Sequence, residues 1–389
     1  MERRTGKLIF RAGQVLALVA ACAVPLSLSG CARPDGVLLP VTVGPEIGSK
    51  VDMLVATTRA PSEVPGQVFS GERGDSLSFA NIVVNIPPNR EPGSIQWPSQ
   101  VPGNPEREFV VTRLDPLARS QVLPWFQKLP GNKRRVLVFV HGFNTPFDSS
   151  VFRFAQFVND SQPNLVPVLF SWPSRGQITG YVYDRESTNF SRSDLAYVLA
   201  AAARSPHVDE VVVLAHSMGA WLTVEALRQL ALQNGRIPPK ISNVILASPD
   251  LDIDVFERQV QEMGPKRPAM TIFVSRNDHA LSLSRAIAGD VQRVGALDLT
   301  DPSYAARLEQ ANGITVLDLT ALQGGDALNH TKFATQPDMV RLIGDRLMAG
   351  QDISEGVSGP AGAVDAVGGA VGAVVTAPIQ VFRAGMTAR

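Results

Sequence analysis

The stretch VVVLAHSMGAWLTVEALRQL, residues 211–230, changes its hydrophobic period in the middle. Residues 211–215 are a continuous apolar run of strand length, whereas the apolar residues after Met218 follow the spacing of a helix. Ser217 and Gly219 lie where the two patterns meet, and no residues remain for a loop. The sequence therefore predicts a serine on a sharp turn between a strand and a helix.

The composition is that of a large globular chain without a dominant charge. The 389 residues are 44% hydrophobic, which is enough for a large core, and 36 basic residues balance 36 acidic ones. A net charge of zero gives no field that would attract nucleic acid, so we expect no nucleic-acid partner. The sequence contains no recognisable metal-ligand cluster. Residues 44–50 come nearest to a phosphate loop, but Pro45 removes an amide donor and the glycines lie one residue too close. We expect neither a metal nor a cofactor.

Strand-like and helix-like patterns alternate from Arg135 onward. Apolar runs bounded by turn signals predict strands at Val51–Ala56, Phe79–Ile86, Arg107–Val111, Val136–Val140, Val166–Phe170, Val211–Ala215, Ser242–Ala247, Met270–Ser275 and Gly313–Leu317. Helical spacing predicts helices at about 147–158, 189–203, 218–233, 253–263 and 336–348. Apolar strands joined by helices indicate an α/β fold, with a mostly parallel sheet and helices on both faces. In such folds, ligand sites lie at the carboxyl ends of the strands.

The serine turn has the features of a nucleophile. A serine hydroxyl reacts poorly unless a base lies beside it and hydrogen-bond donors await the oxyanion. On a sharp turn the Ser217 oxygen is exposed above the sheet, and the first amides of the following helix point at the reacting carbonyl. The sequence Ala215-His216-Ser217-Met218-Gly219 resembles the Gly-x-Ser-x-Gly motif of the α/β-hydrolase superfamily, with Ala in place of the first Gly.

A second segment strengthens this resemblance. The predicted strand Val136–Val140 runs directly into His141-Gly142-Phe143-Asn144, which looks like the oxyanion turn of the superfamily. The resemblance implies that the amides of Phe143 and Met218 hold the oxyanion. It also implies that His141 has a structural role.

The general base is sought among five histidines: His141, His207, His216, His279 and His330. In the superfamily, the chain order is serine, acid, histidine. Only His279 and His330 follow Ser217 in the chain. His330 comes after the last predicted strand, where the resemblance implies that the base belongs, so His330 is the predicted base.

Two aspartates remain candidates for the acid. Asp278 follows the predicted strand Met270–Ser275, and Asp250 follows the preceding strand. Both positions are used in the superfamily, and the later one is the commoner, which favours Asp278. Asp250 would then line the pocket or cap the helix that begins near Ile253.

A closer resemblance covers roughly residues 51–348. It is carried by VATTR (55–59), VLVFVHGFNTPFDSS (136–150), FSWPS (170–174) and SPDLD (248–252). These segments look like a bacterial family of α/β-hydrolases of unknown function, DUF900, whose members are described as esterase- or lipase-like. The resemblance implies a hydrolase fold with a Ser-Asp-His site and says little about the substrate.

The segment from Ser171 to Ser187 leaves the carboxyl end of a predicted strand. It carries Trp172 and Tyr181, which would line the substrate pocket together with Asn144. The alternative is a packed crossover loop with no contact to substrate. The sequence supports the two interpretations equally.

The sequence of the N-terminus is typical of a targeting segment. Basic residues precede an apolar run from Val15 to Leu28, and Leu28-Ser29-Gly30-Cys31 resembles the lipobox of bacterial lipoproteins. The resemblance implies lipidation of Cys31 and cleavage before it, and Ala32 favours the outer membrane, facing the periplasm. The alternative is an uncleaved membrane anchor. Since Cys22 would be removed, no internal disulfide can form.

These features divide the chain into four parts. We expect a lipoprotein signal peptide over 1–30, a tether over 31–50, the hydrolase domain over 51–350 and a Gly/Ala-rich low-complexity tail over 351–389. The spacing of Gly368 and Gly372 would also suit helix packing in a membrane, but Asp365 and the many glycines favour a disordered tail.

The sequence thus predicts a membrane-tethered serine hydrolase that cleaves small-molecule or lipid esters through an acyl-enzyme. Two other functions are consistent with the same residues. One is an amidase or peptidase with the same triad. The other is a catalytically inactive envelope lipoprotein that acts as a binding module.

Overall fold

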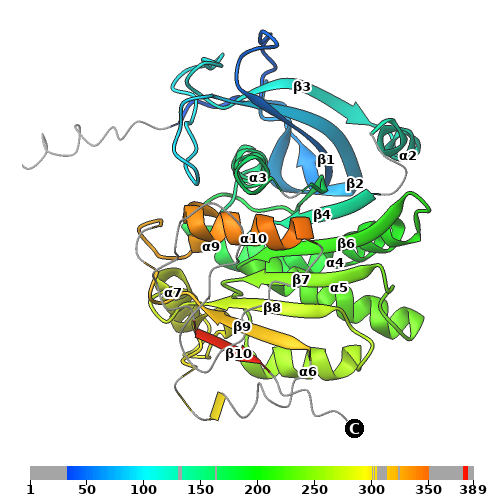
Figure 1. The fold of residues 1–389 in the computed structure, drawn as a ribbon, viewed down its shortest axis with the longest axis vertical. Coiled ribbons are helices and arrows are strands. Elements are labelled where there is room, and N and C mark those ends of the chain that lie inside the picture. Colours follow the sequence, from blue (N-terminus) through cyan, green and yellow to red (C-terminus); the bar gives the residue numbers. More distant parts are fainter. Residues whose placement is uncertain are drawn as a thin grey trace, which may run out of the picture. The chain divides into compact units, whose positions relative to one another are not determined.

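The predicted strands join into one sheet in the computed structural model, which describes residues 33–129, 134–162, 164–299, 301, 303–304, 313–322, 325–349 and 380–383. Within these residues the sheet has ten strands in the order β10-β9-β8-β7-β6-β4-β5-β1-β2-β3 (Figure 1). The strands are β1 (Ser49–Pro61), β2 (Phe69–Ile86), β3 (Val110–Leu117), β4 (Arg134–Val140), β5 (Val166–Ser171), β6 (Val208–His216), β7 (Ile241–Ala247), β8 (Ala269–Val274), β9 (Ile314–Asp318) and β10 (Gln380–Arg383).

The sheet is mostly parallel, as the sequence predicts. The strands from β1 through β5, β4, β6, β7 and β8 to β9 are parallel to their neighbours. The strands β2 and β3 at one end and β10 at the other run antiparallel. From β4 the chain moves first to β5 on one side and then to β6 on the other. The carboxyl ends of β4 and β6 therefore form the switch point at which such folds place their sites.

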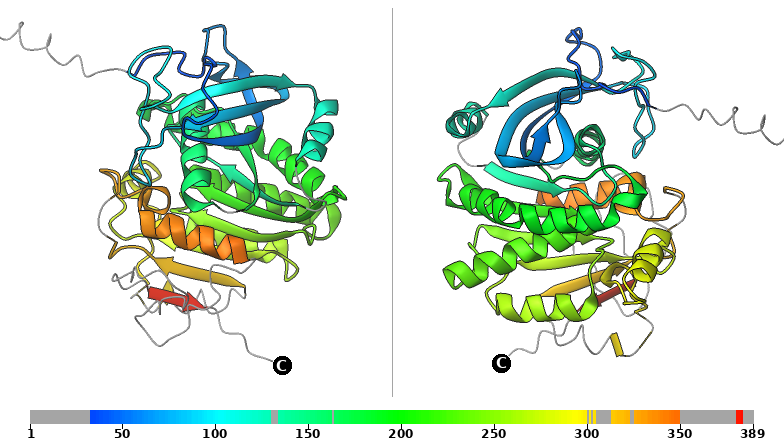
Figure 2. Two further views of the ribbon diagram at one scale, coloured as in Figure 1. Left: turned by 45° about the horizontal axis from the view of Figure 1, so that its top comes forward. Right: turned by 180° about the vertical axis from the view of Figure 1, so that it is seen from behind.

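Helices cover both faces of the sheet (Figure 2). They are α2 (Arg119–Lys128), α3 (Phe147–Ser161), α4 (Tyr181–Arg204), α5 (Met218–Asn234), α6 (Ile253–Met263), α7 (His279–Ile287), α9 (Lys332–Thr335) and α10 (Pro337–Ala349), with short 3-10 turns η2 (Ile178–Gly180) and η3 (Val294–Ala296). Side chains of one strand alternate between two cores: Val136, Val138 and Val140 of β4 pack on the side of α4 and α5, whereas Leu137 and Phe139 pack on the side of α3 and α10. This double burial is why the strands read as continuous apolar runs.

Some boundaries differ from the prediction. The helix expected at about 189 begins at Tyr181, because its first turns bury polar side chains such as Asp184, Ser187 and Ser191, which hide the helical period. The strand expected at Arg107–Val111 lies at Val110–Leu117. The helices α2, α7 and α9 were not predicted.

The segments before residue 51 and after residue 350 also differ in part from the prediction. Val37 and Leu38 are buried in the core beside α3, and the amide of Val41 donates to the carbonyl of Val111 over 2.8 Å, so the chain joins the domain well before residue 50. Within the predicted tail, the strand β10 pairs with β9. Cys31, the signal peptide and most of the tail lie outside the described residues. None of the described helices has the length and hydropathy needed to cross a membrane.

Candidate active site

Ser217 lies at the junction of β6 and α5 with a strained backbone. Its φ of 53° and ψ of −122° fall outside the regions that a residue with a side chain prefers. Neighbouring backbone groups hold this conformation: the Ser217 amide donates to the carbonyl of Ala247 over 2.9 Å, and its carbonyl accepts from the amides of Ala220 and Asp250 over 3.0 and 3.2 Å. The predicted sharp turn is therefore present, and backbone strain is stored at this serine.

The turn after β4 packs directly against the turn that carries Ser217. A Cβ atom on Gly219 would lie 2.2 Å from the carbonyl oxygen of His141, and one on Gly142 would lie 2.9 Å from Cβ of Ser217. Both contacts exclude any side chain. The two glycines thus allow the ends of β4 and β6 to meet.

This contact brings the predicted oxyanion donors close to the serine. Met218 is the first residue of α5, and Phe143 lies one residue beyond Gly142. Within the described residues, neither amide donates to a protein acceptor. Their role as donors to an oxyanion stays a prediction.

His141 supports this turn from behind. Its Nδ1 donates to the carbonyl of Gly142 over 2.9 Å, its Nε2 accepts from the amide of Trp172 over 3.2 Å, and its ring stacks on the Trp172 indole with centroids 4.8 Å apart. Burial and the nearby Arg59 lower the pKa of His141 to about 3, so the imidazole is neutral. Trp172 is fully buried and also donates to the carbonyl of His141 over 2.8 Å. It therefore lies in the core behind the turn and is not part of an accessible pocket wall.

Arg59 is a central structural residue to which the sequence interpretation gave no role. Its fully buried guanidinium donates to the carbonyls of Thr145 (2.7 Å) and Ser174 (3.0 Å) and to Nε2 of His141 (3.3 Å). Burial lowers its pKa to about 9, against the opposing charge of Asp184. Arg59 thereby joins the end of β1 to the turn after β4 and to the segment after β5. Its place at the end of the VATTR segment was visible in the sequence, but its acceptors were not.

Asp184 completes this support. Its buried carboxylate accepts from the amides of Asn144 (3.2 Å) and Arg175 (3.0 Å) and from the Ser174 hydroxyl. Burial raises its pKa above the ordinary value, and these hydrogen bonds oppose that shift. Asn144 itself is exposed and has a positive φ of 55°, so the carboxylate fixes the backbone of the turn at a strained residue.

Asp278 and His330, predicted as acid and base, lie together. Oδ2 of Asp278 accepts from Nδ1 of His330 over 2.7 Å, and Oδ1 accepts from the Leu281 amide at the start of α7 over 3.0 Å. Asp278 is fully buried, whereas the His330 side chain keeps 12% of its surface exposed. Burial opposes protonation of His330, but the hydrogen bond and the charge of Asp278 outweigh it, so the pKa of His330 lies above its ordinary value.

The His330 ring also reaches the residue next to the serine. The rings of His216 and His330 lie 4.7 Å apart, and Nε2 of His216 donates to the His330 carbonyl over 3.2 Å. In the described part of the chain, no hydrogen bond joins the Ser217 hydroxyl to the His330 imidazole. Such bonds are often long before substrate binds. The assignment of Ser217, Asp278 and His330 as a triad stays a prediction.

Asp250 has different partners from Asp278. Its buried carboxylate forms an ion pair with Arg293 at 3.2 Å and accepts from the hydroxyls of Tyr181 (3.1 Å) and Ser284. Asp278, and not Asp250, accepts the hydrogen bond from Nδ1 of His330. Of the two other roles expected for Asp250, capping is wrong, because Asp252 caps α6 by accepting from the amides of Asp254 and Val255. Its role as the alternative acid stays a prediction.

Tyr181, a predicted pocket residue, is mostly buried. Besides its bond to Asp250, its hydroxyl lies 2.9 Å from that of Ser284, and its ring packs edge-on against Phe143 with centroids 5.3 Å apart. Tyr181 therefore connects the start of α4 with α7 beside the predicted oxyanion turn.

Two polar networks hold the segment that carries His330. The buried ammonium of Lys332 donates to Ser275 Oγ (3.0 Å), Asn277 Oδ1 (2.9 Å) and the Leu319 carbonyl (3.0 Å), which ties this segment to the loop of Asp278. Burial lowers the pKa of Lys332, and the charge of Asp278 opposes this shift.

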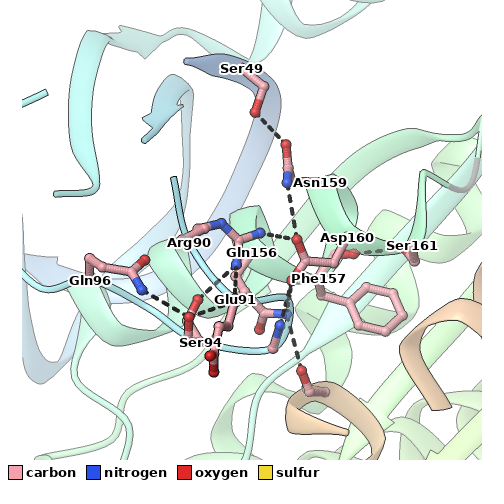
Figure 3. A network of polar contacts seen from close by, with 12 residues as sticks. Ser49, Arg90, Glu91, Ser94, Gln96, Gln156, Phe157, Asn159, Asp160 and Ser161 are labelled. Carbon is pink, nitrogen blue, oxygen red and sulfur yellow. Dashed lines mark hydrogen bonds and ion pairs between the residues drawn. The ribbon is translucent and has the colours of Figure 1, made fainter. Parts of the chain in front are cut away.

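The second network centres on Asp160 in α3. Figure 3 shows the Arg90 guanidinium directed at the Asp160 carboxylate, with which it forms a nearly fully buried ion pair. The same carboxylate accepts from the amide of Gly93 (2.7 Å) and from Gln156 (2.8 Å), and Gln156 also donates to the Ala334 carbonyl in α9 over 3.1 Å. The loop after β2 and α3 therefore hold α9, which begins two residues after His330.

Comparison with known proteins shows one matching family and several similar structures. A model of the family described as "Alpha/beta hydrolase of unknown function (DUF900)" matches residues 120–346. A curated relative, the uncharacterized protein alr1448 of Nostoc sp., is 26% identical over 125 residues, which cover 26% of this chain and 33% of the relative. The chain thus spans about a third of the length of that relative.

Three solved structures are similar at low identity. A CIB-like hydrolase from Thermoplasma acidophilum is 16% identical, with a TM-score of 0.35, 57% of this chain covered and 89% of the other. Est1E from Butyrivibrio proteoclasticus is 11% identical, with a TM-score of 0.37 and coverages of 70% and 96%. The esterase Pf2001 of Pyrococcus furiosus is 9% identical, with a TM-score of 0.34 and coverages of 82% and 99%.

Proposed function

The chain belongs to the DUF900 family of alpha/beta hydrolases, and from this premise we propose that it is a serine hydrolase that cleaves carboxylic esters. The observation that carries the proposal is the strained Ser217 at the switch point, with the hydrogen-bonded Asp278 and His330 on the neighbouring loops. A backbone outlier held by its surroundings is the arrangement in which a serine oxygen is presented to a substrate.

The proposed reaction proceeds in two halves. Ser217 Oγ attacks the acyl carbon while Nε2 of His330 takes its proton, and the amides of Phe143 and Met218 stabilise the oxyanion. His330 then protonates the leaving alcohol, which leaves an acyl-enzyme on Ser217. A water molecule, deprotonated by His330, attacks the acyl-enzyme. The bond from the acyl carbon to Ser217 Oγ then breaks, His330 returns the proton to Oγ, and the acid is released. Asp278 keeps Nδ1 of His330 protonated and stabilises the imidazolium.

Esters are the proposed substrates because an alcohol leaves more readily than an amine, which must be protonated as it departs. Ester cleavage therefore depends less than amide cleavage on proton donation by His330. The test compares matched ester and anilide substrates with the same acyl group, on the wild type and on Ser217→Ala. We expect ester hydrolysis by the wild type, little anilide hydrolysis, and loss of both in the variant. Faster anilide cleavage would indicate an amidase. No Ser217-dependent turnover of either substrate would contradict the proposal.

We also propose that the enzyme is lipid-anchored through Cys31 in the bacterial envelope, at the outer membrane facing the periplasm. The basic and apolar N-terminal segment and the Leu28-Ser29-Gly30-Cys31 sequence support this location. Metabolic labelling with an alkyne fatty acid should mark the wild type and not Cys31→Ser. Equal labelling of both would contradict the anchor.

A further inference from the structure

Several large apolar side chains lie exposed beside the candidate active site. Among the described residues, twelve large hydrophobic side chains are exposed. Five of them lie on three segments next to the site: Ile178 (68% exposed), Val182 (69%), Leu283 (53%), Ile287 (51%) and Leu328 (49%). We call these five residues the apolar rim. Single exposed apolar residues are ordinary, so the apolar rim is of interest only if its segments lie together.

The three segments of the apolar rim are joined to one another. Ile178 and Val182 lie on η2 and the first turn of α4, and Leu283 and Ile287 lie one turn apart on α7. The hydroxyls of Tyr181 and Ser284, 2.9 Å apart, connect α4 with α7.

The third segment is joined to α7 by the backbone. The amide of His279 at the start of α7 donates to the carbonyl of Leu328 over 2.9 Å, and Leu328 precedes His330 by two residues. The apolar rim therefore follows the loops that carry Asp278 and His330 and continues to the start of α4, beside Phe143.

Two cations next to the apolar rim are paired with carboxylates. Arg285 pairs with Asp290 at 2.8 Å, and Arg175 pairs with Glu72 at 2.9 Å. Neither cation is free to attract an anionic partner, and the nearby Asp326 carboxylate accepts from the amides of His330 and Thr331. The surface is thus suited to an apolar, electrically neutral partner rather than to an anionic one.

Given the proposed ester hydrolysis, on which this inference rests, we propose that the apolar rim contacts the acyl region of a lipid–water interface. The substrates are then water-insoluble esters presented in an aggregated phase. Contact with such a phase removes the five side chains from water and brings the acyl carbon to Ser217. A second copy of the chain is the alternative occupant of this surface.

The experiment uses the full-length chain and tributyrin, an uncharged triester, below and above its solubility limit. The test variant is Leu283→Gln/Ile287→Gln. The control is Leu123→Gln/Leu232→Gln, whose side chains are exposed to a similar degree (48% and 58%) on α2 and α5. We expect the wild-type rate to rise on emulsification. On the emulsion, the test variant should be about tenfold slower than the wild type. On dissolved tributyrin, its rate should stay within about twofold of the wild-type rate. The control variant should have the wild-type rate on both the dissolved and the emulsified substrate.

A second variant on another segment, Ile178→Gln/Val182→Gln, keeps the test valid if α7 does not tolerate its substitutions. Equal rates for test and control variants on the emulsion would overturn the inference. So would a change from dimer to monomer in the test variants at an unchanged emulsion rate, which would assign the apolar rim to self-association. A wild type active on dissolved tributyrin, with no gain on emulsification, contradicts the inference and leaves the proposed function intact. Inactivity on both forms contradicts both.

Discussion

The two buried aspartates that are candidates for the acid, Asp278 and Asp250, have different partners, so their substitutions should have different effects. Asp278→Asn removes the anion that holds His330, and we expect kcat/KM to fall on the order of 10⁴-fold with a small change in stability. Asp250→Asn weakens the buried pair with Arg293, so we expect a loss of unfolding free energy of about 3 kcal/mol and a smaller effect on the rate.

Steady-state kinetics and chemical denaturation of both variants, side by side, check this ranking. A larger rate loss in Asp250→Asn than in Asp278→Asn would move the role of the acid to Asp250.

His330 also gives the enzyme a pH dependence whose sign follows from its surroundings. His330 must be neutral to accept a proton, and its pKa lies above the ordinary 6.5 because Asp278 stabilises the imidazolium against the effect of burial. We therefore expect kcat/KM to rise with pH through a midpoint above 6.5 and then level off. In Asp278→Asn the residual activity should rise through a lower midpoint. A midpoint that stays in place or moves up would contradict this account.

At the scale of single residues, the sequence identified candidates whose chemistry depends on local spacing. Ser217 could be found because a strand period gives way to a helix period around it, and His330 could be selected by its place in the chain. Arg59 and Lys332 could not be found in this way. Each is a buried cation whose acceptors come from segments far apart in the sequence, so only the fold reveals that the charge is satisfied.

At the scale of elements, the junction of β4, β6 and α5 depends on a glycine. Gly219→Ala would place a Cβ atom 2.2 Å from the His141 carbonyl, so the two turns must separate and the serine must move. We expect activity to fall at least 10²-fold, as for other small displacements of reacting groups, with clear destabilisation. Gly235→Ala at the end of α5 is the matched control. Its φ is also positive, at 70°, but no atom lies within 4 Å of the added methyl group, so it should cost about 1 kcal/mol and leave activity unchanged.

Activity and thermal unfolding of both glycine variants provide the measurement. Wild-type activity in Gly219→Ala would show that the close contact of the turns is not needed.

The helices and strands could be predicted from the sequence where burial of apolar side chains alone determines the pattern. The six strands from β4 to β9 are apolar because both of their faces are buried, and the sequence located all of them. The start of α4 was missed because Asp184 and its neighbouring serines are buried for their hydrogen bonds, which apolar periodicity does not report. The predicted pocket role of Trp172 does not fit its full burial, because its indole stacks on His141.

At the scale of the whole molecule, the Asp160 network links three distant parts of the chain. Asp160→Ala leaves the buried guanidinium of Arg90 without its anion and frees Gly93 and Gln156, so we expect a loss of about 3–5 kcal/mol in unfolding free energy. Asp338→Ala breaks an exposed pair with Arg341 and should cost less than about 1 kcal/mol.

Chemical denaturation of the two variants measures both values. The same experiment should show reduced turnover in Asp160→Ala below its unfolding transition, because α9 and the adjoining His330 segment lose an anchor. Equal stabilities of the two variants would refute the structural role of the network.

The sequence predicted the fold class, but not the order of the strands in the sheet. Continuous apolar strands alternating with helices indicated a mostly parallel sheet, and the family match agrees. The order of the strands and the antiparallel pairing of β10 depend on long-range contacts that no local pattern encodes. The packing of Val37 and Leu38 into the core was not predicted, because the surrounding residues are rich in Pro and Gly, which is typical of a linker.

In the proposed mechanism, Ser217 is a nucleophile that His330 and Asp278 activate. This role is tested by treating the folded full-length chain with a fluorophosphonate and locating the adduct by mass spectrometry. We expect one adduct, on Ser217, that is absent in Ser217→Ala and forms much more slowly in His330→Ala. A folded wild type that stays unlabelled, or that carries the adduct on another residue, would contradict it.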